Sequence, residues 1–284
     1  MQNRISAQAT RLDMRAVAIG AALALVCAFP AVAQQQRTAP ALDVPYVPTP
    51  DDVVAKMLDL ANVTKDDYVI DLGSGDGRIA IAAAKRGAKA FGVDLNPVRV
   101  EEAQANAKAA GVEDRVEFKE ANIFETDFSD ATVLTMYLLS SVNLKLRPQV
   151  LEMKPGTRVV SHAFDMGEWE PDEVARVDGR TVYYWVVPAR VEGKWKVNRA
   201  QKAFTVNFKQ EFQNLTGTAE MDGKEVPVED AKLEGTRITF TLADGNGGKL
   251  RFEGRVDGDR IKPSAEKQAS GDEKPGDWEA TRAS

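Results

Sequence analysis

An apolar stretch that ends in three closely spaced glycines constrains the fold of this chain more than any other feature. Residues 69–77 read Val-Ile-Asp-Leu-Gly-Ser-Gly-Asp-Gly, and an alanine-rich run follows from Arg78. The apolar residues predict a strand, and the run after the glycines predicts a helix. Because glycine has no Cβ and takes positive φ easily, the backbone between them can turn sharply and approach a ligand closely. The free N–H groups of the helix would then face that ligand.

The spacing of the glycines separates two classes of ligand. Dinucleotide-binding folds need a glycine at position 78, where this chain has Arg78. The spacing G-x-G-x-G after Asp71 is instead that of enzymes that bind S-adenosylmethionine (SAM), in which the acid lies near the ammonium group of the cofactor. A second acid, Asp94, ends the next apolar strand and can accept hydrogen bonds from both ribose hydroxyls. A tight turn in an unrelated α/β domain is the alternative.

Three segments together resemble a known family. The motif Asp-Leu-Gly-Ser-Gly-Asp-Gly-Arg, the upstream Pro-Tyr-Val-Pro-Thr-Pro of residues 45–50, and the later Ser-His-Ala-Phe and Trp-Glu-Pro at 161–164 and 169–171 resemble class I SAM-dependent methyltransferases. Within them they resemble the branch with the ATP synthase c-subunit lysine methyltransferases and their exported bacterial relatives. The resemblance covers roughly residues 44–190. It implies an α/β fold with a Rossmann-like, doubly wound, mostly parallel sheet, and SAM as the cofactor.

The resemblance and the strand ends imply a cofactor site. Asn122 follows the third strand and can contact the adenine amino group, or it can cap a turn, and many relatives have Asp there. The segment around Tyr46 folds over the cofactor in the resembling branch, or it only caps the first helix. The expected cofactor-binding residues are Tyr46, Thr49, Asp71, Gly73, Ser74, Gly75, Asp76, Gly77, Asp94, Leu95, Asn122 and Ile123.

Two residues are candidates for the chemistry. Methyl transfer is an in-line displacement, which requires alignment more than catalytic groups. Tyr137 ends the fourth strand, and its hydroxyl can orient an amine unless the ring only packs there. The Asp/Asn-Pro-Pro-Tyr sequence of many amino-methylating enzymes is missing at this point, which disfavours nucleobase and glutamine acceptors. His162, the single histidine, ends the fifth strand as a candidate general base or a structural residue. We expect no metal.

The N-terminus has the pattern of a targeting segment. Three arginines precede the apolar run 16–29, and Ala31-Val32-Ala33 offers a cleavage site. The run is short for a permanent membrane anchor. Residues 1–33 are therefore predicted to be a signal peptide and 34–43 a flexible lead, which places the mature protein in the periplasm or outside the cell.

Cleavage after residue 33 changes what the mature chain can do. It removes Cys27, the single cysteine, which excludes disulfides and thiolate metal sites. The 37 Lys and Arg and 43 Asp and Glu of the whole chain become 34 and 42, a net charge of −8. No basic stripe is visible, so we expect no nucleic-acid partner.

The spacing of apolar residues differs between two parts of the mature chain. Residues 44–189 alternate apolar strands with helices, as expected for the methyltransferase domain. The predicted strands are 68–72, 89–95, 116–121, 132–137 and 158–163, with a helix from Asn96-Pro97 to Gly111 and another capped by Thr49. Residues 190–284 alternate with a period of two between Asp-Gly turns, which predicts a small antiparallel barrel or sandwich that a strand at 277–281 closes.

These observations predict an exported SAM-dependent methyltransferase that acts on an amine of a protein, with lysine as the candidate. Two alternatives stay open. One is a non-catalytic SAM-binding sensor or scaffold whose β domain holds a partner, and the other is a methyltransferase for a small molecule. The sequence contains no signal for the oligomeric state.

Overall fold

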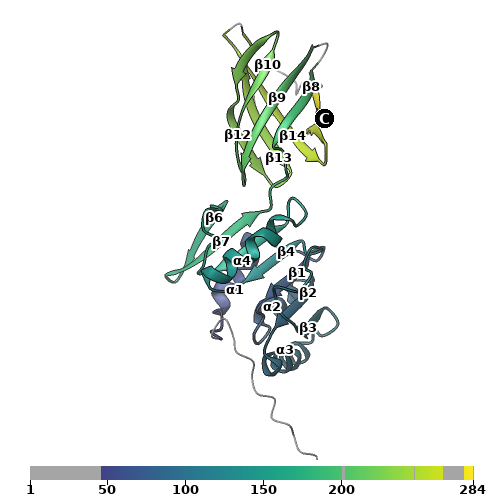
Figure 1. Cartoon of the computed structure of the whole chain (residues 1–284). Coiled ribbons are helices and arrows are strands. Elements are labelled where there is room, and N and C mark those ends of the chain that lie inside the picture. Colours follow the sequence, from purple (N-terminus) through teal and green to yellow (C-terminus); the bar gives the residue numbers. More distant parts are fainter. Residues whose placement is uncertain (1–45, 200–201, 246, 265–277, 284) are drawn as a thin grey trace, which may run out of the picture. The chain divides into compact units, whose positions relative to one another are not determined.

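The computed structural model describes residues 46–199, 202–245, 247–264 and 278–283 (Figure 1). They form two sheets, one of seven strands and one of nine. The predicted signal peptide and flexible lead lie outside the described residues. In the part of the chain that is described, no helix is both long enough and apolar enough to cross a membrane.

The first sheet is doubly wound, as predicted. Its strand order is β3-β2-β1-β4-β5-β7-β6. The first five strands run parallel, and β7 is antiparallel to both β5 and β6. The order reverses between β1 and β4, and open α/β sheets bind ligands at the carboxyl ends of the strands at such a point. The strands are β1 (Tyr68–Leu72), β2 (Lys89–Asp94), β3 (Val116–Glu120), β4 (Val133–Met136), β5 (Arg158–His162), β6 (Glu173–Val177) and β7 (Arg180–Val186).

Helices cover both faces of this sheet because successive strand residues point to opposite faces. Val69 packs with α1 (Asp51–Leu60), α2 (Arg78–Lys85) and α3 (Pro97–Ala110) in one apolar cluster. Ile70 packs in a second cluster, with buried residues of α4 (Ser140–Leu151). Strand β1 is therefore buried from both sides, which explains why its buried residues are apolar apart from Asp71.

Local signals placed some element ends correctly. Asn96 caps α3 by accepting the N–H of Val98, and Gly111 ends the helix with a φ of 67°. The predicted cap of α1 was wrong by one residue, because Pro50 is the N-cap and the Thr49 hydroxyl meets the ring of His162 instead. Strand 68–72 is confirmed. The other four predicted strands each end one residue earlier, because the chain turns at the carboxyl edge of the sheet.

The second sheet is a nearly closed antiparallel barrel. Strand β16 pairs with both β15 and β8 and so closes one side, as predicted. Strands β11 and β12 flank Val228 and pair with β10 and β13, so one bent segment joins the two ends of the sheet. The strands are β8 (Gly193–Arg199), β9 (Lys202–Glu211), β10 (Asn214–Met221), β11 (Lys224–Pro227), β12 (Glu229–Glu234), β13 (Arg237–Ala243), β14 (Lys249–Asp257), β15 (Arg260–Pro263) and β16 (Trp278–Arg282).

Aromatic side chains fill the barrel. Phe240 stacks on its cross-strand partner Phe252 at 4.7 Å between ring centroids, and Trp278 meets both rings edge-on. Ala189 already belongs to this core. The division into separate domains at residues 189 and 190 stays a prediction.

Candidate functional site

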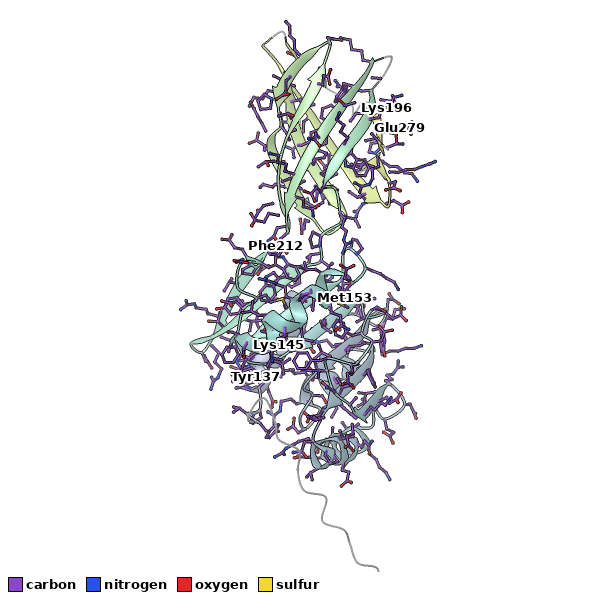
Figure 2. All side chains as sticks on the ribbon, in the orientation of Figure 1. Tyr137, Lys145, Met153, Lys196, Phe212 and Glu279 are labelled. Carbon is purple, nitrogen blue, oxygen red and sulfur yellow. The ribbon has the colours of Figure 1, made fainter. Side chains whose placement is uncertain are left out.

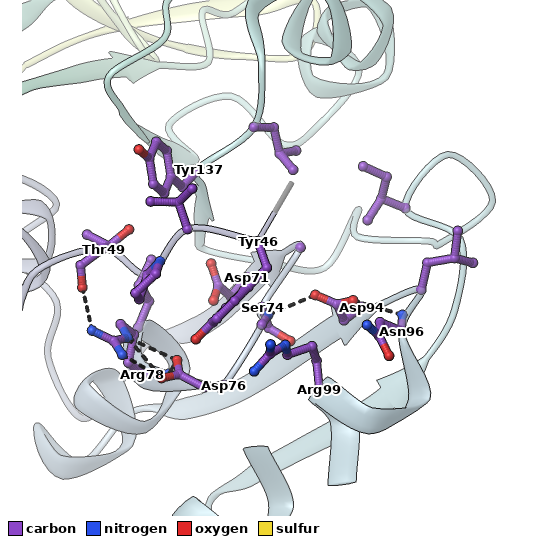
Figure 3. A pocket seen from close by; sticks show the side chains of 18 of the residues that line it. Tyr46, Thr49, Asp71, Ser74, Asp76, Arg78, Asp94, Asn96, Arg99 and Tyr137 are labelled. Carbon is purple, nitrogen blue, oxygen red and sulfur yellow. Dashed lines mark hydrogen bonds and ion pairs between the residues drawn. The ribbon is translucent and has the colours of Figure 1, made fainter. Parts of the chain in front are cut away.

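A cavity of about 320 Å³ lies at the carboxyl edge of β1, β2 and β4. Twelve of the fourteen predicted site residues line it, and the two exceptions are Gly77 and His162. Figure 3 shows Tyr46 and Asp71 between Tyr137 on one side and Asp94 on the other. Sequence reasoning missed part of the wall, namely Val47, Pro48, Arg78, Ile79, Asn96, Arg99, Leu138, Leu139 and Phe164.

The glycine turn is held on the neighbouring strand. The N–H groups of Gly73 and Ser74 donate to the carbonyl of Val93 at 2.9 and 2.8 Å. The N–H of Gly75 donates to Asp94 at 2.9 Å, and the other carboxylate oxygen of Asp94 accepts the N–H of Asn96 at 2.8 Å. Asp94 therefore shapes the turn as well as lining the cavity, which sequence reasoning did not anticipate.

Gly77, a predicted cofactor residue, lies beside the cavity wall, and its role toward the cofactor stays a prediction. It has a φ of 81°, and a Cβ at this position would lie 2.6 Å from the ring of Phe118 and 2.9 Å from Ala103. It is not among the residues that line the cavity. The need for glycine here comes from close packing of α2 against α3 and β3.

Asp71 is a buried acid at the base of the cavity, with 1% of its surface exposed. Burial raises its pKa from 3.8 to about 7, although a hydrogen bond from Thr135 opposes this rise and the charges of Asp94 and Asp76 add to it. The Thr135 hydroxyl donates at 2.7 Å. A ligand cation would favour the ionised form of this acid.

Tyr46 covers the glycine turn. A Cβ on Gly75 would lie 2.5 Å from its ring, and the guanidinium of Arg99 stacks on that ring at 3.8 Å from the centroid. The Tyr46 hydroxyl lies close enough to Asp76 for the two groups to shift each other's pKa. Burial, followed by the charge of Asp76, raises the pKa of Tyr46. The ring is held on the turn from three directions. Neither the position of Arg99 nor its charge is part of any motif that could have revealed this role.

Arg78 ties the N-terminal segment to the turn. Its guanidinium donates to both oxygens of Asp76, at 2.9 and 2.6 Å, and to the Thr49 carbonyl at 2.8 Å. Burial acts to raise the pKa of Asp76, but the hydrogen bonds and charge of Arg78 outweigh it and lower that pKa. Arg78, which stands where a dinucleotide-binding motif needs glycine, thus links the N-terminal segment at Thr49 to the glycine turn.

The far end of the cavity contains Asn122, Ile123 and Leu95. The amide oxygen of Asn122 accepts the N–H of Phe124 at 3.0 Å, and its nitrogen donates to Glu125 at 3.2 Å. Asn122 therefore does cap a turn, which was the alternative interpretation, and it also lines the cavity. Its contact with adenine stays a prediction.

The two candidates for the chemistry lie at different depths. Tyr137 lines the cavity, and His162 lies behind it, with the ring centroids 4.0 Å apart. Only 2% of His162 is exposed, and its Nδ1 is 3.2 Å from the Thr49 hydroxyl. Burial, followed by the charge of Arg180, lowers the pKa of His162 to about 4, against the opposing charge of Asp52. His162 is thus a neutral imidazole near pH 7, and contact with an acceptor would have to pass through its neighbours.

The donor set fits SAM. The buried hydroxyl oxygen of Ser74 lies at the cavity wall and has no hydrogen-bond partner among the residues that the structure describes. Asp71 can face an ammonium group, and Asp94 can accept ribose hydroxyls. The described residues include no cluster of three or more His, Cys, Asp or Glu side chains that could hold a metal ion.

Known proteins that are similar to this chain are methyltransferases by name. Residues 71–173 match the family model described as the ANTKMT methyltransferase domain. The chain is 51% identical over 151 residues to a protein-lysine N-methyltransferase of Saccharolobus islandicus, covering 51% of this chain and 94% of that protein. It is 32% identical over 166 residues to the ATP synthase c-subunit lysine N-methyltransferase of Caenorhabditis elegans, covering 56% of this chain and 86% of that protein.

One solved structure is similarly close. It is described as an RNA methyltransferase from Salinibacter ruber in complex with S-adenosylhomocysteine. It is 53% identical to this chain, covers 51% of it and 96% of its own length, and superimposes with a TM-score of 0.50.

Proposed function

The chain belongs to the family of the ANTKMT methyltransferase domain, and on that basis we propose that it methylates the ε-amino group of lysine in a protein. It is a methyltransferase whose cofactor is SAM. The alternative of a non-catalytic sensor is set aside, because the relatives are named as enzymes. One observation carries the choice of acceptor, namely the 51% identity to a protein-lysine methyltransferase over 94% of its length.

The reaction needs a neutral amine and a fixed direction of attack. Bound SAM supplies a methyl group on a positively charged sulfur. The lysine ammonium would first lose its proton to water, so that the neutral nitrogen could accept this methyl group while the sulfur leaves as an uncharged thioether. In-line alignment is the main requirement. Asp71 and Asp94 would hold the two ends of the cofactor, and Tyr46 would exclude water above the turn.

Charge near the cavity supports a cationic acceptor. Phe164 at the cavity wall belongs to residues 163–175, a stretch with five acids and no Lys or Arg. We propose that this stretch borders the mouth of the cavity, where it would attract lysine and repel a phosphate backbone. RNA is the second candidate acceptor, because the 53% identical structure is described as an RNA methyltransferase. Small molecules are the third.

The test uses tritiated SAM with cell-envelope proteins, total RNA and a small-molecule extract in parallel. We expect label in protein, on lysine by mass spectrometry of the digest. The matched blank is Gly75→Val, which places side-chain atoms against Tyr46 and the cofactor turn. Label that enters only RNA, or only the small-molecule fraction, would refute the proposal.

We also propose that the mature enzyme works outside the cytoplasm. The support is the sequence pattern of residues 1–33, with arginines, an apolar run and a cleavage site. SAM is made in the cytoplasm, so this location requires delivery of the cofactor across the membrane. Mass spectrometry of the periplasmic fraction for SAM tests that requirement directly.

A further inference from the structure

The backbone between β5 and β6 contains a strained turn at the cavity. The N–H of Phe164 donates to the carbonyl of His162 at 2.8 Å, which closes a three-residue γ-turn centred on Ala163. Ala163 has a φ of 65°. Among the described residues, six other than glycine have positive φ, and four of them are Asn or Asp, which tolerate this conformation. Alanine does not, and such strain persists only where surrounding contacts hold it.

Buried polar groups hold this turn. The Ser161 hydroxyl donates to the Phe164 carbonyl at 2.6 Å. The amide of Asn143 in α4, which has no exposed surface, donates to the same carbonyl at 3.2 Å and to the Asp165 carbonyl at 3.1 Å. The N–H of Ala163 continues the pairing with β7 by donating to Thr181. Groups from three elements therefore converge on one turn.

The turn places Phe164 beside Tyr137. Both line the cavity, and their rings are nearly parallel with centroids 6.1 Å apart. Tyr137 lies shortly before the first residue of α4, the helix that contains Lys145 (Figure 2). Tyr137 lies away from Asp94, the expected ribose contact (Figure 3). It is therefore at the end where an acceptor would meet the methyl group.

We propose that Phe164 and Tyr137 form the aromatic wall of a subsite for a primary ammonium or amine, and that Asn143 and Ser161 are positioning residues that hold Phe164 in it. The proposal rests on the proposed function, because an aliphatic amine is the acceptor it implies. A cation over an aromatic face gains roughly 0.5–2 kcal/mol, which corresponds to about a 2- to 30-fold change in affinity. Such a wall discriminates a lysine side chain from a neutral chain of equal size.

The first experiment measures binding without turnover. The probe is n-butylammonium, which copies the lysine side chain, and n-butanol is its neutral counterpart. Each is titrated into the S-adenosylhomocysteine complex of the full mature chain and followed by ligand-observed NMR. We expect butylammonium to bind more tightly than butanol. Phe164→Leu should weaken butylammonium about 2- to 30-fold and leave butanol and the cofactor product unchanged.

Control variants separate the wall from the fold. Phe128→Leu removes a buried aromatic ring from the apolar cluster that contains Ile70, does not alter the cavity wall, and should leave butylammonium binding unchanged. Ala163→Gly should keep binding and raise the melting temperature, because glycine takes positive φ without strain. Ser161→Ala should weaken butylammonium in the same direction as Phe164→Leu. Asn143→Ala provides the same comparison if it folds.

The outcomes distinguish the two proposals. Equal binding of butylammonium to wild type and Phe164→Leu, or no preference over butanol, overturns the subsite. Unchanged binding in Ser161→Ala and Asn143→Ala overturns the positioning role. Kinetics with poly-L-lysine then test turnover, where Phe164→Leu should raise KM more than it lowers kcat. If wild type labels neither poly-L-lysine nor envelope protein, the lysine proposal fails while the binding result stands.

Discussion

Replacing Asp71, the buried acid at the base of the cavity, should make the protein more stable and its cofactor binding weaker. Asp71 is buried, and within the described part of the chain its carboxylate accepts a hydrogen bond from Thr135 alone. Burial raises its pKa from 3.8 to about 7. Asp71→Asn keeps the side-chain shape and an oxygen for Thr135, but the amide never ionises. The substitution therefore removes the free-energy cost of burying an ionised carboxylate in the absence of the ligand.

The sign follows from proton binding. Between the unfolded pKa of 3.8 and the folded pKa of about 7, the folded chain binds more protons than the unfolded chain. The free energy of unfolding therefore falls as the pH rises through this window, by about 1.4 kcal/mol per pH unit, and levels off above it. The free energy of unfolding of Asp71→Asn relative to wild type should therefore rise by about 2 kcal/mol from pH 4 to 5.5 and by about 2 more from pH 5.5 to 8.5.

The assay is urea unfolding of both proteins without cofactor at each pH. Tryptophan fluorescence follows unfolding, with Trp169 and Trp185 buried against the first sheet and Trp195 and Trp278 in the barrel. The control is Asp66→Asn, because that side chain is 82% exposed and its replacement leaves burial of charge unchanged. A difference between Asp71→Asn and wild type that stays constant from about pH 5 to 8.5 would refute the reasoning.

The same variant tests the ligand side of the argument. If the ionised Asp71 faces the ammonium group of SAM, wild-type affinity should fall up to tenfold per pH unit below about 7, and Asp71→Asn should bind weakly at every pH. Calorimetry across this range measures both curves. A flat wild-type curve would place the ammonium group elsewhere.

Three further predictions concern the turn, the ribose and the N-terminus. Gly75→Ala should lower SAM affinity because its Cβ would lie 2.5 Å from the Tyr46 ring. The control is Gly111→Ala, which has a similar φ with no atom within 4 Å of the added Cβ and should lower only stability. Equal calorimetric affinities in the two variants would contradict this. Asp94→Ala should lose about 2–4 kcal/mol of cofactor binding, and Asp94→Asn should lose less because it keeps one acceptor for the turn; a loss well under about 1 kcal/mol in Asp94→Ala would show that the acid does not hold the ribose. N-terminal sequencing of the native protein should begin at Gln34 in the periplasmic or secreted fraction, and an uncleaved cytosolic chain would overturn export.

Several features of the fold and site could be predicted because neighbouring residues encode them. Glycine turns at positive φ, Asn-Pro starts a helix, and strand alternation shows which faces are buried. These preferences act over a few residues and hold wherever the chain runs. They predicted the doubly wound sheet, the antiparallel barrel, and most of the cavity wall at the strand ends.

Other features depend on contacts between residues far apart in the chain. The Thr49 hydroxyl does not cap α1 because it contacts the ring of His162, which lies 113 residues later in the chain. Arg99 covers Tyr46 only because α3 begins at the same sheet edge. The strained turn at Ala163 contradicts the preference of alanine and exists because Asn143 and Ser161 satisfy it. Local propensity is worth about 1 kcal/mol per residue, and a few buried hydrogen bonds outweigh it once the tertiary structure brings their partners together.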